Sequence, residues 1–288
     1  MIEHNETLEQ ARARNIRDAL AEDIGRGDWT AMLVPAAQRV RSRVIVREDA
    51  VLCGRDWFDG TVRALDAGAR IDWFAREGER VQAGATLCEI EAQARALLSA
   101  ERPALNFLQL LSATATLTRA HVDAIAGASP NPRGCAILDT RKTIPGLRQA
   151  QKYAVRVGGG RNQRLALWHG ILIKENHIAA AGGIAQVLAQ ARALDAGVEI
   201  QIEVETLAQL AEALQHGATS IMLDNFEPAA MREAVAINAG RAELEVSGGV
   251  QIEQLREIAA TGVDRISIGA LTKNVRAVDL SMRVIERL

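Results

Sequence analysis

The sequence lacks the features that mark membrane proteins, disulfide-rich secreted domains and nucleic-acid-binding proteins. No apolar run approaches the roughly 18 residues that a membrane-spanning helix needs. The three cysteines, Cys53, Cys88 and Cys135, form neither a metal-binding spacing nor a disulfide framework, so we expect a reducing compartment, the cytoplasm. Aromatic residues make up only 3% of the chain and the net charge is −2, which leaves little for stacking on bases or attracting a polyanion.

Lysine is scarce as well. Of 34 basic residues only four are lysines: Lys142, Lys152, Lys174 and Lys273. The compact ammonium differs from the planar guanidinium, so a lysine in so arginine-rich a chain favours a position that arginine would not serve.

The segment 141–174 is rich in basic residues and contains no aspartate or glutamate. Its basic residues are Arg141, Lys142, Arg148, Lys152, Arg156, Arg161, Arg164 and Lys174. Such a block creates a strong local positive potential. Arginine clamps carboxylates and lysine neutralises phosphate, so the block predicts a site for a small anion rather than a solvated basic face.

The first part of the chain has the pattern of a small mixed domain. Apolar spacing predicts a helix over 8–22. Between Val40 and Ile90, polar and apolar residues alternate and glycines punctuate them, which predicts short antiparallel strands. A long helix is expected to begin near Glu101, with Pro103 in its first turn, and we place the domain change near the start or middle of this helix.

The second half alternates short apolar strands with amphipathic helices. Strands are expected at AILDTRK, ILIKENH, EIQIEVET, SIMLDN, ELEVSGG and RISIGAL, and helices at LAQLAEALQHGA, PAAMREAVAINAG and IEQLREIAATG. The strand-end residues at 203, 224, 247 and 269 are 21, 23 and 22 positions apart. This regular period predicts a parallel α/β barrel, with an open doubly wound sheet as the alternative. The absence of GxGxxG argues against a dinucleotide fold.

Active sites of parallel barrels lie at the carboxyl ends of the strands, and those ends carry functional groups here. They supply Asp139, Arg141, Lys142, Lys174, Glu203, Asp224, Ser247 and Gly269. The loops SGGV (247–250) and SIGALT (267–272) predict a phosphate site, because glycine lets backbone N–H groups approach a phosphate. Glu203 and Asp224 could hold ribose hydroxyls or help to organise Mg²⁺, although Glu203 could instead pair with a lysine. The GGG at 158–160 is either a further backbone contact or a flexible turn.

Together these strings resemble the quinolinate phosphoribosyltransferase family over nearly the whole chain. The matching strings are DIGRGDWT (23–30), ERPALNFLQLLS (101–112), LDTRKTIPGLR (138–148), KYAVRVGGGRNQR (152–164), LIKENHI (172–178), IEVETL (202–207), IMLDNFEP (221–228), LEVSGGV (244–250) and ISIGALT (266–272). The combination of DTRKT-PGLR, GGG-N-x-R and LIK-x-NH is highly specific.

The resemblance implies a type II phosphoribosyltransferase fold. An N-terminal α/β sandwich domain would span 1–114, an incomplete parallel α/β barrel would span 115–272, and 273–288 would pack back onto the first domain. It also implies a homodimer and the joining of quinolinate to phosphoribosyl pyrophosphate with Mg²⁺. The products would be nicotinate mononucleotide, CO₂ and pyrophosphate, in NAD biosynthesis.

The resemblance further implies roles for individual residues. Lys142, Lys174, Glu203 and Asp224 would be catalytic, and Glu203 and Asp224 would meet the ribose. The residues expected to bind the acceptor are Arg102, donated by the partner subunit, and Arg141, Lys142, Gln163, Arg164 and Lys174. The 5′-phosphate would lie at Ser247, Gly248, Gly249, Gly269 and Ala270. Two positions depart from the family pattern: many members have histidine where this chain has Gln163, and aspartate where it has His169.

Three other functions fit parts of the sequence. Lys174 could be the Schiff-base nucleophile of a barrel aldolase, which would require a desolvated lysine of lowered pKa. The segment 76–94 resembles the hairpin of a biotinyl or lipoyl carrier, but no lysine occurs before Lys142 to be modified. A phosphoribosyltransferase for a different small acid also fits.

Overall fold

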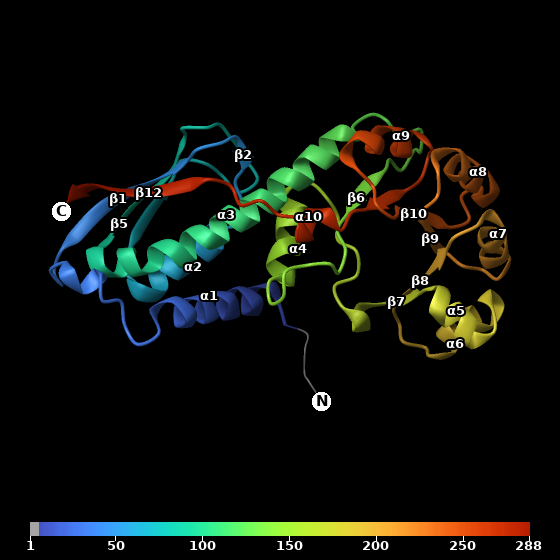
Figure 1. Ribbon diagram of the computed structural model, residues 1–288, viewed down its shortest axis with the longest axis horizontal. Coiled ribbons are helices and arrows are strands. Elements are labelled where there is room, and N and C mark those ends of the chain that lie inside the picture. The colour runs from blue at the N-terminus through green and yellow to red at the C-terminus, as the bar shows by residue number, and fades with distance from the viewer. Residues whose placement is uncertain (1–5) are drawn as a thin grey trace. The chain divides into compact units, whose positions relative to one another are not determined.

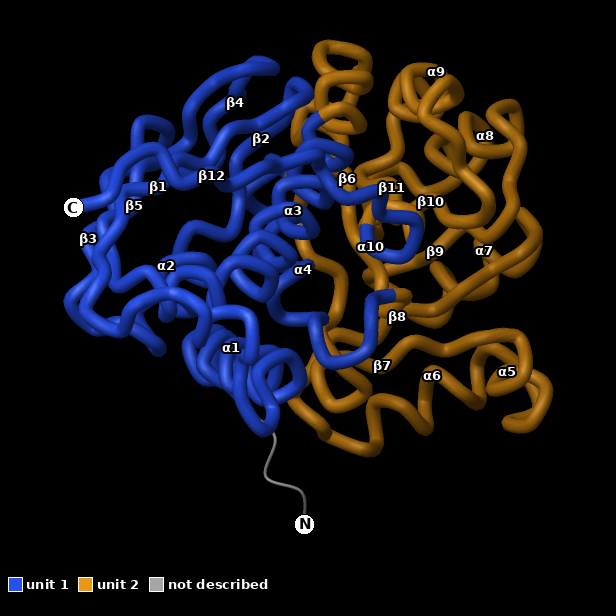
Figure 2. Tube along the Cα trace, turned by 60° about the vertical axis from the view of Figure 1, so that its left-hand side comes forward, with its two compact units in different colours: residues 1–119, 143–159, 272–288 blue, residues 120–142, 160–271 orange. Residues whose placement is uncertain are grey.

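The computed structural model describes residues 6–288 and contains two compact units (Figure 1). The first comprises residues 1–119, 143–159 and 272–288, and the second comprises 120–142 and 160–271 (Figure 2). The domain limits drawn from sequence, 114/115 and 272/273, stay predictions. Within 6–288, no helix has the length and apolarity to cross a membrane.

The first unit is built on a four-stranded antiparallel sheet. Its order is β12-β1-β5-β3, formed by β1 (Arg39–Val46), β3 (Arg70–Trp73), β5 (Thr86–Gln93) and β12 (Leu280–Arg287). β1 buries every second residue, as its alternating sequence predicts. On its outer face Arg41 bridges Glu91 and Glu286 across the neighbouring strands. Residues 280–287 therefore form an edge of this sheet.

A second, two-stranded sheet pairs β2 (Ala50–Val51) with β4 (Arg80–Val81). The segment 76–94 consequently does not form the carrier-like hairpin that it resembles. Its first strand, β4, pairs with β2, whereas its second, β5, pairs with β1 and β3.

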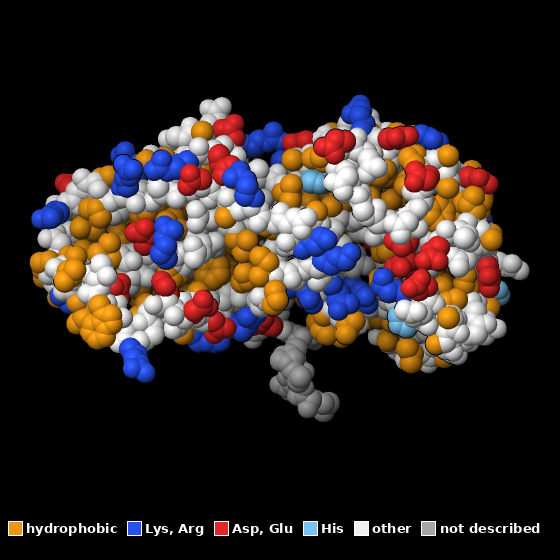
Figure 3. Space-filling model, in the orientation of Figure 1, with side chains coloured by type: hydrophobic (Ala, Val, Ile, Leu, Met, Phe, Trp, Pro, Cys, Tyr) orange, Lys and Arg blue, Asp and Glu red, His pale blue; other side chains and the backbone are white. Residues whose placement is uncertain are grey.

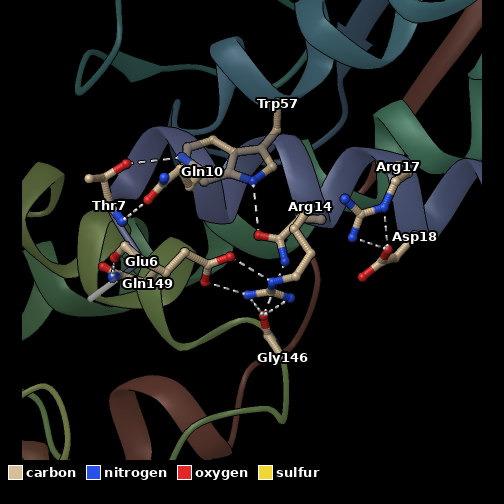
Figure 4. A network of polar contacts seen from close by, with 10 residues as sticks. Glu6, Thr7, Gln10, Arg14, Arg17, Asp18, Trp57, Gly146 and Gln149 are labelled. Carbon is tan, nitrogen blue, oxygen red and sulfur yellow. Dashed lines mark hydrogen bonds and ion pairs between the residues drawn. The ribbon is translucent and has the colours of Figure 1, made fainter. Parts of the chain in front are cut away.

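Helix α1 (Leu8–Ile24) confirms the helix predicted over 8–22. Thr7 and Gln10 form a reciprocal capping box at its start, which satisfies two backbone N–H groups that the first turn leaves unpaired (Figure 4). Further along the helix, the side chains of Arg14 and Asn15 both donate to the carbonyl of Gly146. These contacts fix the segment at 146 to the first unit.

Helix α2 (Arg55–Leu65) was not predicted, because its glycines suggested turns between strands. Its buried residues are Trp57, Phe58, Thr61 and Val62, which is a helical spacing. Gly60 lies inside the helix where a Cβ atom would be 2.6 Å from Ile16 Cδ1. The glycine therefore marks a close approach to α1, not a turn.

Helix α3 (Ala94–Ala124) begins seven residues before the predicted position, and Pro103 lies inside it rather than in its first turn. A proline in a helix interior costs about 3 kcal/mol or more. The early turns bury Ala94, Leu97 and Ala100 in the core of the first unit, and this burial favours a helix on both sides of the proline. The remaining helices of this unit are η1 (Ala31–Leu33) and α4 (Arg148–Val157).

The second unit contains a six-stranded parallel sheet, which confirms the predicted α/β architecture. Its order is β6-β11-β10-β9-β8-β7, and the strands are β6 (Ala136–Leu138), β7 (Gly170–Ile173), β8 (Glu199–Val204), β9 (Ser220–Asp224), β10 (Glu243–Ser247) and β11 (Arg265–Ser267). From β7 to β11 the order follows the sequence, and β6 closes onto β11. This is the order of a barrel opened between β6 and β7. A doubly wound sheet would reverse direction, so that alternative is wrong.

Three helices of this unit follow the prediction. α7 (Leu207–Gln215), α8 (Pro228–Asn238) and α9 (Leu255–Ala260) are each followed by a glycine of positive φ. These glycines are Gly217, Gly240 and Gly262, with φ of 72°, 78° and 94°. The other helical elements between 160 and 273 are η2 (Leu167–His169), α5 (Glu175–Ala181), α6 (Ile184–Ala193), η3 (Ile252–Gln254) and α10 (Ala270–Lys273).

Candidate active site

The carboxyl ends of the six parallel strands lie at one edge of the sheet, and most of the predicted site residues are there. Asp139 follows β6, Lys174 follows β7, and Gly269 lies two residues after β11. Glu203 is near the end of β8, while Asp224 and Ser247 are the last residues of β9 and β10. All these residues belong to the second unit.

Asp139 is fully buried and holds the loop that carries the predicted acceptor residues. Its carboxylate accepts from Asn162 Nδ2 at 2.6 Å and from the backbone N–H of Gln163 at 3.0 Å. Next to it, the N–H of Arg161 donates to the Ile137 carbonyl at 2.8 Å, so the loop runs along the free edge of β6. The sequence indicated Asp139 only as a strand-end charge; its anchoring role comes from the structure.

Arg164 is a half-buried cation that follows this loop. Its Nη1 donates to the Gly170 carbonyl at 2.8 Å, and within residues 6–288 it has no carboxylate partner. Burial, and secondarily the positive charge of Arg141, lower the pKa of the Arg164 guanidinium. Two neighbouring guanidinium groups in such a place favour an anionic ligand.

Lys174, Glu203 and Asp224 converge at the ends of β7, β8 and β9. Lys174 Nζ lies 2.8 Å from Glu203 Oε2. The pKa of Asp224 is raised by burial and by Glu203, while Lys174 and Lys142 oppose this shift. Figure 3 shows acidic side chains gathered over β8 and β9 on this face. The four charged groups thus interact with one another, as a site for a polyanionic sugar substrate requires.

The Lys174 side chain is 49% exposed and paired with a carboxylate. A Schiff-base aldolase needs the reverse, a desolvated lysine away from negative charge. The aldolase hypothesis is therefore not supported by this geometry.

The Ser247–Gly249 loop requires glycine. Gly248 has φ 105°, and a Cβ there would be 2.1 Å from Asn225 Oδ1 and 3.1 Å from the Asn225 backbone nitrogen. Asn225 itself donates its N–H to the Ser247 carbonyl at 3.1 Å and its Nδ2 to Asp224 Oδ2 at 2.8 Å. The loop also borders a cavity of about 570 Å³ between α8 and α9. The backbone of the Ser247–Gly249 loop is thus linked through Asn225 to the carboxylate of Asp224.

The second glycine loop contacts Lys142 directly. A Cβ at Gly269 would lie 3.0 Å from Lys142 Cδ and 3.5 Å from Thr140 Oγ1. Thr140 Oγ1 also accepts from the N–H of Lys142 at 3.0 Å. Ala270 begins α10 immediately afterwards. Gly269 therefore leaves the space that the aliphatic part of Lys142 occupies.

Some of the predicted basic residues are not in this unit. Arg148, Lys152 and Arg156 lie on α4 of the first unit, where Lys152 is buried, so the basic block is divided between the two units. Arg102 lies on α3 of the first unit with an exposed side chain beside Glu101.

The first glycine of the GGG segment has a packing role. A Cβ at Gly158 would be 2.6 Å from both the Ala115 carbonyl oxygen and Thr118 Cβ of α3. Gly158 thus permits close packing of the end of α4 against α3.

The two departures from the family pattern have local partners. Gln163 Nε2 donates to Gln201 Oε1 at 3.1 Å. His169 Nδ1 accepts from the N–H of Leu165 at 3.0 Å, in a turn that an aspartate carboxylate could close in the same way. The contact between Gln201 and Gln163 could not be read from the sequence, because the two residues are 38 positions apart.

Comparison with known proteins agrees with this geometry. The models of the N-terminal and C-terminal domains of quinolinate phosphoribosyl transferase match residues 28–112 and 114–283. The chain is 41% identical to the nicotinate-nucleotide pyrophosphorylase [carboxylating] of Mycobacterium leprae, over 93% of this chain and 95% of that protein. A probable enzyme of the same name from Bacillus subtilis is 39% identical, over 91% and 90%.

Among solved structures, the nicotinate-nucleotide pyrophosphorylase from Francisella tularensis has a TM-score of 0.91 and 42% identity, covering 98% of both chains. The chain therefore belongs to the quinolinate phosphoribosyltransferase family, and it is a pentosyltransferase that forms nicotinate mononucleotide from quinolinate in NAD biosynthesis.

Proposed function

We propose that the carboxyl edge of the six-stranded sheet binds quinolinate and phosphoribosyl pyrophosphate together, with Lys142, Lys174, Glu203 and Asp224 as the catalytic residues. The observation that carries this proposal is the mutual interaction of these four charged groups between the Ser247–Gly249 loop and the Asp139-anchored loop. The Ser247–Gly249 loop suits a phosphate, and the loop anchored by Asp139 presents cations.

The acceptor would lie against the cationic side of this edge. Arg141 and Arg164, with Arg102 of a second copy, would neutralise the two carboxylates of quinolinate, and Gln163 would add a neutral hydrogen bond. Lys142 and Lys174 would bridge from the acceptor towards the phosphates. The absence of a carboxylate partner for Arg164 within the described residues supports this assignment.

The sugar phosphate would lie on the other side. Glu203 bonds Lys174 through Oε2 and can accept a ribose hydroxyl through Oε1, and Asp224 can accept another. The 5′-phosphate would meet the backbone of the two glycine loops, through Ser247, Gly248, Gly249, Gly269 and Ala270.

A magnesium ion would arrive with phosphoribosyl pyrophosphate. Within 6–288, no three His, Cys, Asp or Glu side chains are grouped to hold a metal. Mg²⁺ prefers oxygen ligands and commonly takes one or two carboxylates together with substrate phosphates, so Glu203 and Asp224 suffice for it. When bound, it would neutralise charge on the pyrophosphate leaving group.

The protein's own residues would act mainly by positioning and electrostatics. The pyridine nitrogen of quinolinate has a free lone pair, so attack on the ribose C1 requires no general base. The difficulty is to bring two carboxylates beside a polyphosphate, and the arginines and lysines reduce that repulsion. The pyridinium that results can stabilise the carbanion left by the 2-carboxylate as CO₂ departs.

An assay with two acceptors tests this proposal. With phosphoribosyl pyrophosphate and Mg²⁺, we expect mononucleotide and CO₂ from quinolinate and no turnover of nicotinate. Excess EDTA should abolish turnover, and excess Mg²⁺ should restore it. Mass spectrometry of the mononucleotide and measurement of CO₂ provide the readouts. Turnover of nicotinate alone, or activity that is insensitive to EDTA, would contradict the acceptor or metal assignment respectively.

A homodimer is the proposed assembly. Arg102 is exposed beside Glu101, and Glu101 lines an apolar groove of about 380 Å³ in the first unit. Exposed Leu33 and Val284 border the same groove, and a second copy would remove this apolar surface from water. The cytoplasm is the proposed location, consistent with three free cysteines.

Mixing two inactive variants tests the donation of Arg102 across the dimer. Arg102→Ala and Lys142→Met should each be nearly inactive alone. If random exchange places the two intact residues in one of the two sites of a heterodimer, a 1:1 mixture should recover about one quarter of wild-type activity. A mixture of Lys142→Met with Arg141→Ala is the control, because Arg141 and Lys142 belong to the same unit. This mixture should recover no activity. It would recover about one quarter only if Arg141 also acted from the partner. No recovery in the first mixture, after exchange is verified by native mass spectrometry, would show that Arg102 acts within its own chain.

A further inference from the structure

A line of polar side chains crosses the interior of the six-stranded sheet, starting at the site. Gln163 Nε2 donates to Gln201 Oε1 at 3.1 Å, and Gln201 Nε2 donates to Glu245 Oε2 at 2.8 Å. Arg265 Nε lies 3.1 Å from the same oxygen of Glu245. These residues come from the loop after α4 and from β8, β10 and β11. Gln201 is 3% exposed and Glu245 is fully buried.

The direction of these hydrogen bonds is determined by the charge at their inner end. Arg265 also bonds Glu199 at 3.0 Å and Glu243 at 2.9 Å, so it is a fixed cation beside Glu245. Burial raises the pKa of Glu245, and the positive charge of Arg265 opposes that shift by favouring the carboxylate. Glu245 Oε2 lies between Arg265 Nε and Gln201 and accepts the hydrogen bond from Gln201, so Gln201 turns its Nε2 towards Glu245. Gln201 Oε1 then faces Gln163, and Gln163 donates a hydrogen bond to it from Nε2.

Gln163 is thus held through both its backbone and its side chain. Its backbone N–H is bound by the buried Asp139, and its side-chain amide by Gln201. An amide without the second contact could rotate by half a turn and exchange its carbonyl and its NH₂ group. A carboxylate-bearing acceptor distinguishes the two orientations, because it pairs with the donor and is repelled by the carbonyl.

We propose that Gln201 is a positioning residue for phosphoribosyl transfer, which sets the orientation of the Gln163 amide and so the affinity for the acid acceptor. This inference rests on the proposed contact of Gln163 with the acceptor. The polarity is transmitted from the Glu245–Arg265 pair through Gln201, and the side chains of Gln201 and Glu245 are both buried.

A double-mutant cycle tests the inference. Gln201→Leu, Gln163→Leu and the double variant are compared by KM for quinolinate, KM for phosphoribosyl pyrophosphate, kcat and melting temperature. Gln201→Leu should raise the quinolinate KM about 3- to 10-fold, as the loss of one ordering hydrogen bond predicts. The same substitution should change the KM for phosphoribosyl pyrophosphate by less than about twofold. In the Gln163→Leu background, Gln201→Leu should have no further effect on the quinolinate KM.

The outcomes separate this inference from the proposal on which it rests. If Gln163→Leu raises the quinolinate KM but Gln201→Leu does not, or if their effects simply multiply, Gln201 does not act through Gln163. If Gln163→Leu leaves that KM unchanged, the acceptor contact itself is wrong and the inference fails with it.

An exchange variant covers the case in which Gln201→Leu does not fold. Gln201→Glu combined with Glu245→Gln retains each donor and acceptor, because the carboxylate introduced on β8 would accept from Gln163 and from the amide introduced on β10. This pair should keep the wild-type quinolinate KM, whereas Gln201→Glu alone, which places two carboxylates face to face, should raise it. A raised KM in the exchanged pair, equal to that of Gln201→Glu alone, would overturn the inference.

Discussion

Replacing Lys142 with methionine should lower kcat by about 10²- to 10³-fold, the loss expected when one preorganised charge is removed from a transition state. Lys142 follows β6, lies against Gly269 and contributes to the electrostatic environment of Asp224. Its side chain is exposed, so the free energy of unfolding should change by less than about 0.5 kcal/mol. Initial rates with saturating substrates and a urea titration provide the two measurements.

Arg256→Met is a matched control for this substitution. Arg256 is an exposed residue of α9 in the same unit, and within the described residues it has no hydrogen-bonded or ionic partner. Its loss removes the same unit of charge from the protein without touching the candidate site. Near-normal kcat in Lys142→Met, or an equal loss in Arg256→Met, would contradict a specific catalytic role for Lys142.

Replacing Gly248 with alanine should raise the KM for phosphoribosyl pyrophosphate at least about tenfold, since at least one backbone contact to the 5′-phosphate is expected to be lost. The new Cβ would meet Asn225 Oδ1 at 2.1 Å and the Asn225 nitrogen at 3.1 Å, and the φ of 105° is unfavourable for any L side chain. The loop must therefore move away from Asn225. Steady-state kinetics with phosphoribosyl pyrophosphate as the varied substrate would measure the effect.

Gly240→Ala separates backbone strain from the loss of the phosphate site. Gly240 also has a positive φ, 78°, but a Cβ there would meet nothing within 4 Å. This variant should lose about 1–2 kcal/mol of stability from the left-handed conformation alone and keep both KM values. If Gly248→Ala and Gly240→Ala had the same kinetic constants, the Ser247–Gly249 loop would not bind the phosphate.

The sequence predicted the second unit well because its strands are short, apolar and regularly spaced. Each strand end carries a polar residue, and parallel strands bring those ends to one edge. The spacing of Glu203, Asp224, Ser247 and Gly269 therefore carried three-dimensional information. The helices were equally clear, because Gly217, Gly240 and Gly262 end them in the left-handed conformation that glycine permits.

The first unit was harder because its glycines and proline serve packing. Gly60 makes room for Ile16 inside a helix, and Pro103 lies within α3, where burial of the early turns outweighs its cost. Local propensity indicated a turn at the first and a helix start at the second. The contact at Gly60 and the burial of the turns before Pro103 both depend on residues far away in the sequence, so neither can be recognised from local propensity.

The basic block illustrates a different limit. Its charges are contiguous in the sequence, yet the chain leaves the second unit at Lys142 and returns at Gly160. The intervening Arg148, Lys152 and Arg156 are therefore on α4 of the first unit. The polar line from Gln163 to Arg265 escaped prediction for the opposite reason, because its members are separated by 38 to 44 residues or lie on strands that pair only in the folded sheet.

The placement of β12 has a consequence for the order in which the protein forms. The sheet of the first unit receives its edge strand from residues 280–287, which are synthesised after the whole of the second unit. The second unit, by contrast, is nearly continuous over 160–271 and can be completed earlier on the ribosome. Until residues 280–287 emerge, β1 presents unpaired backbone groups along the side that β12 will cover. The growing chain thus carries an open sheet edge throughout the synthesis of the second unit.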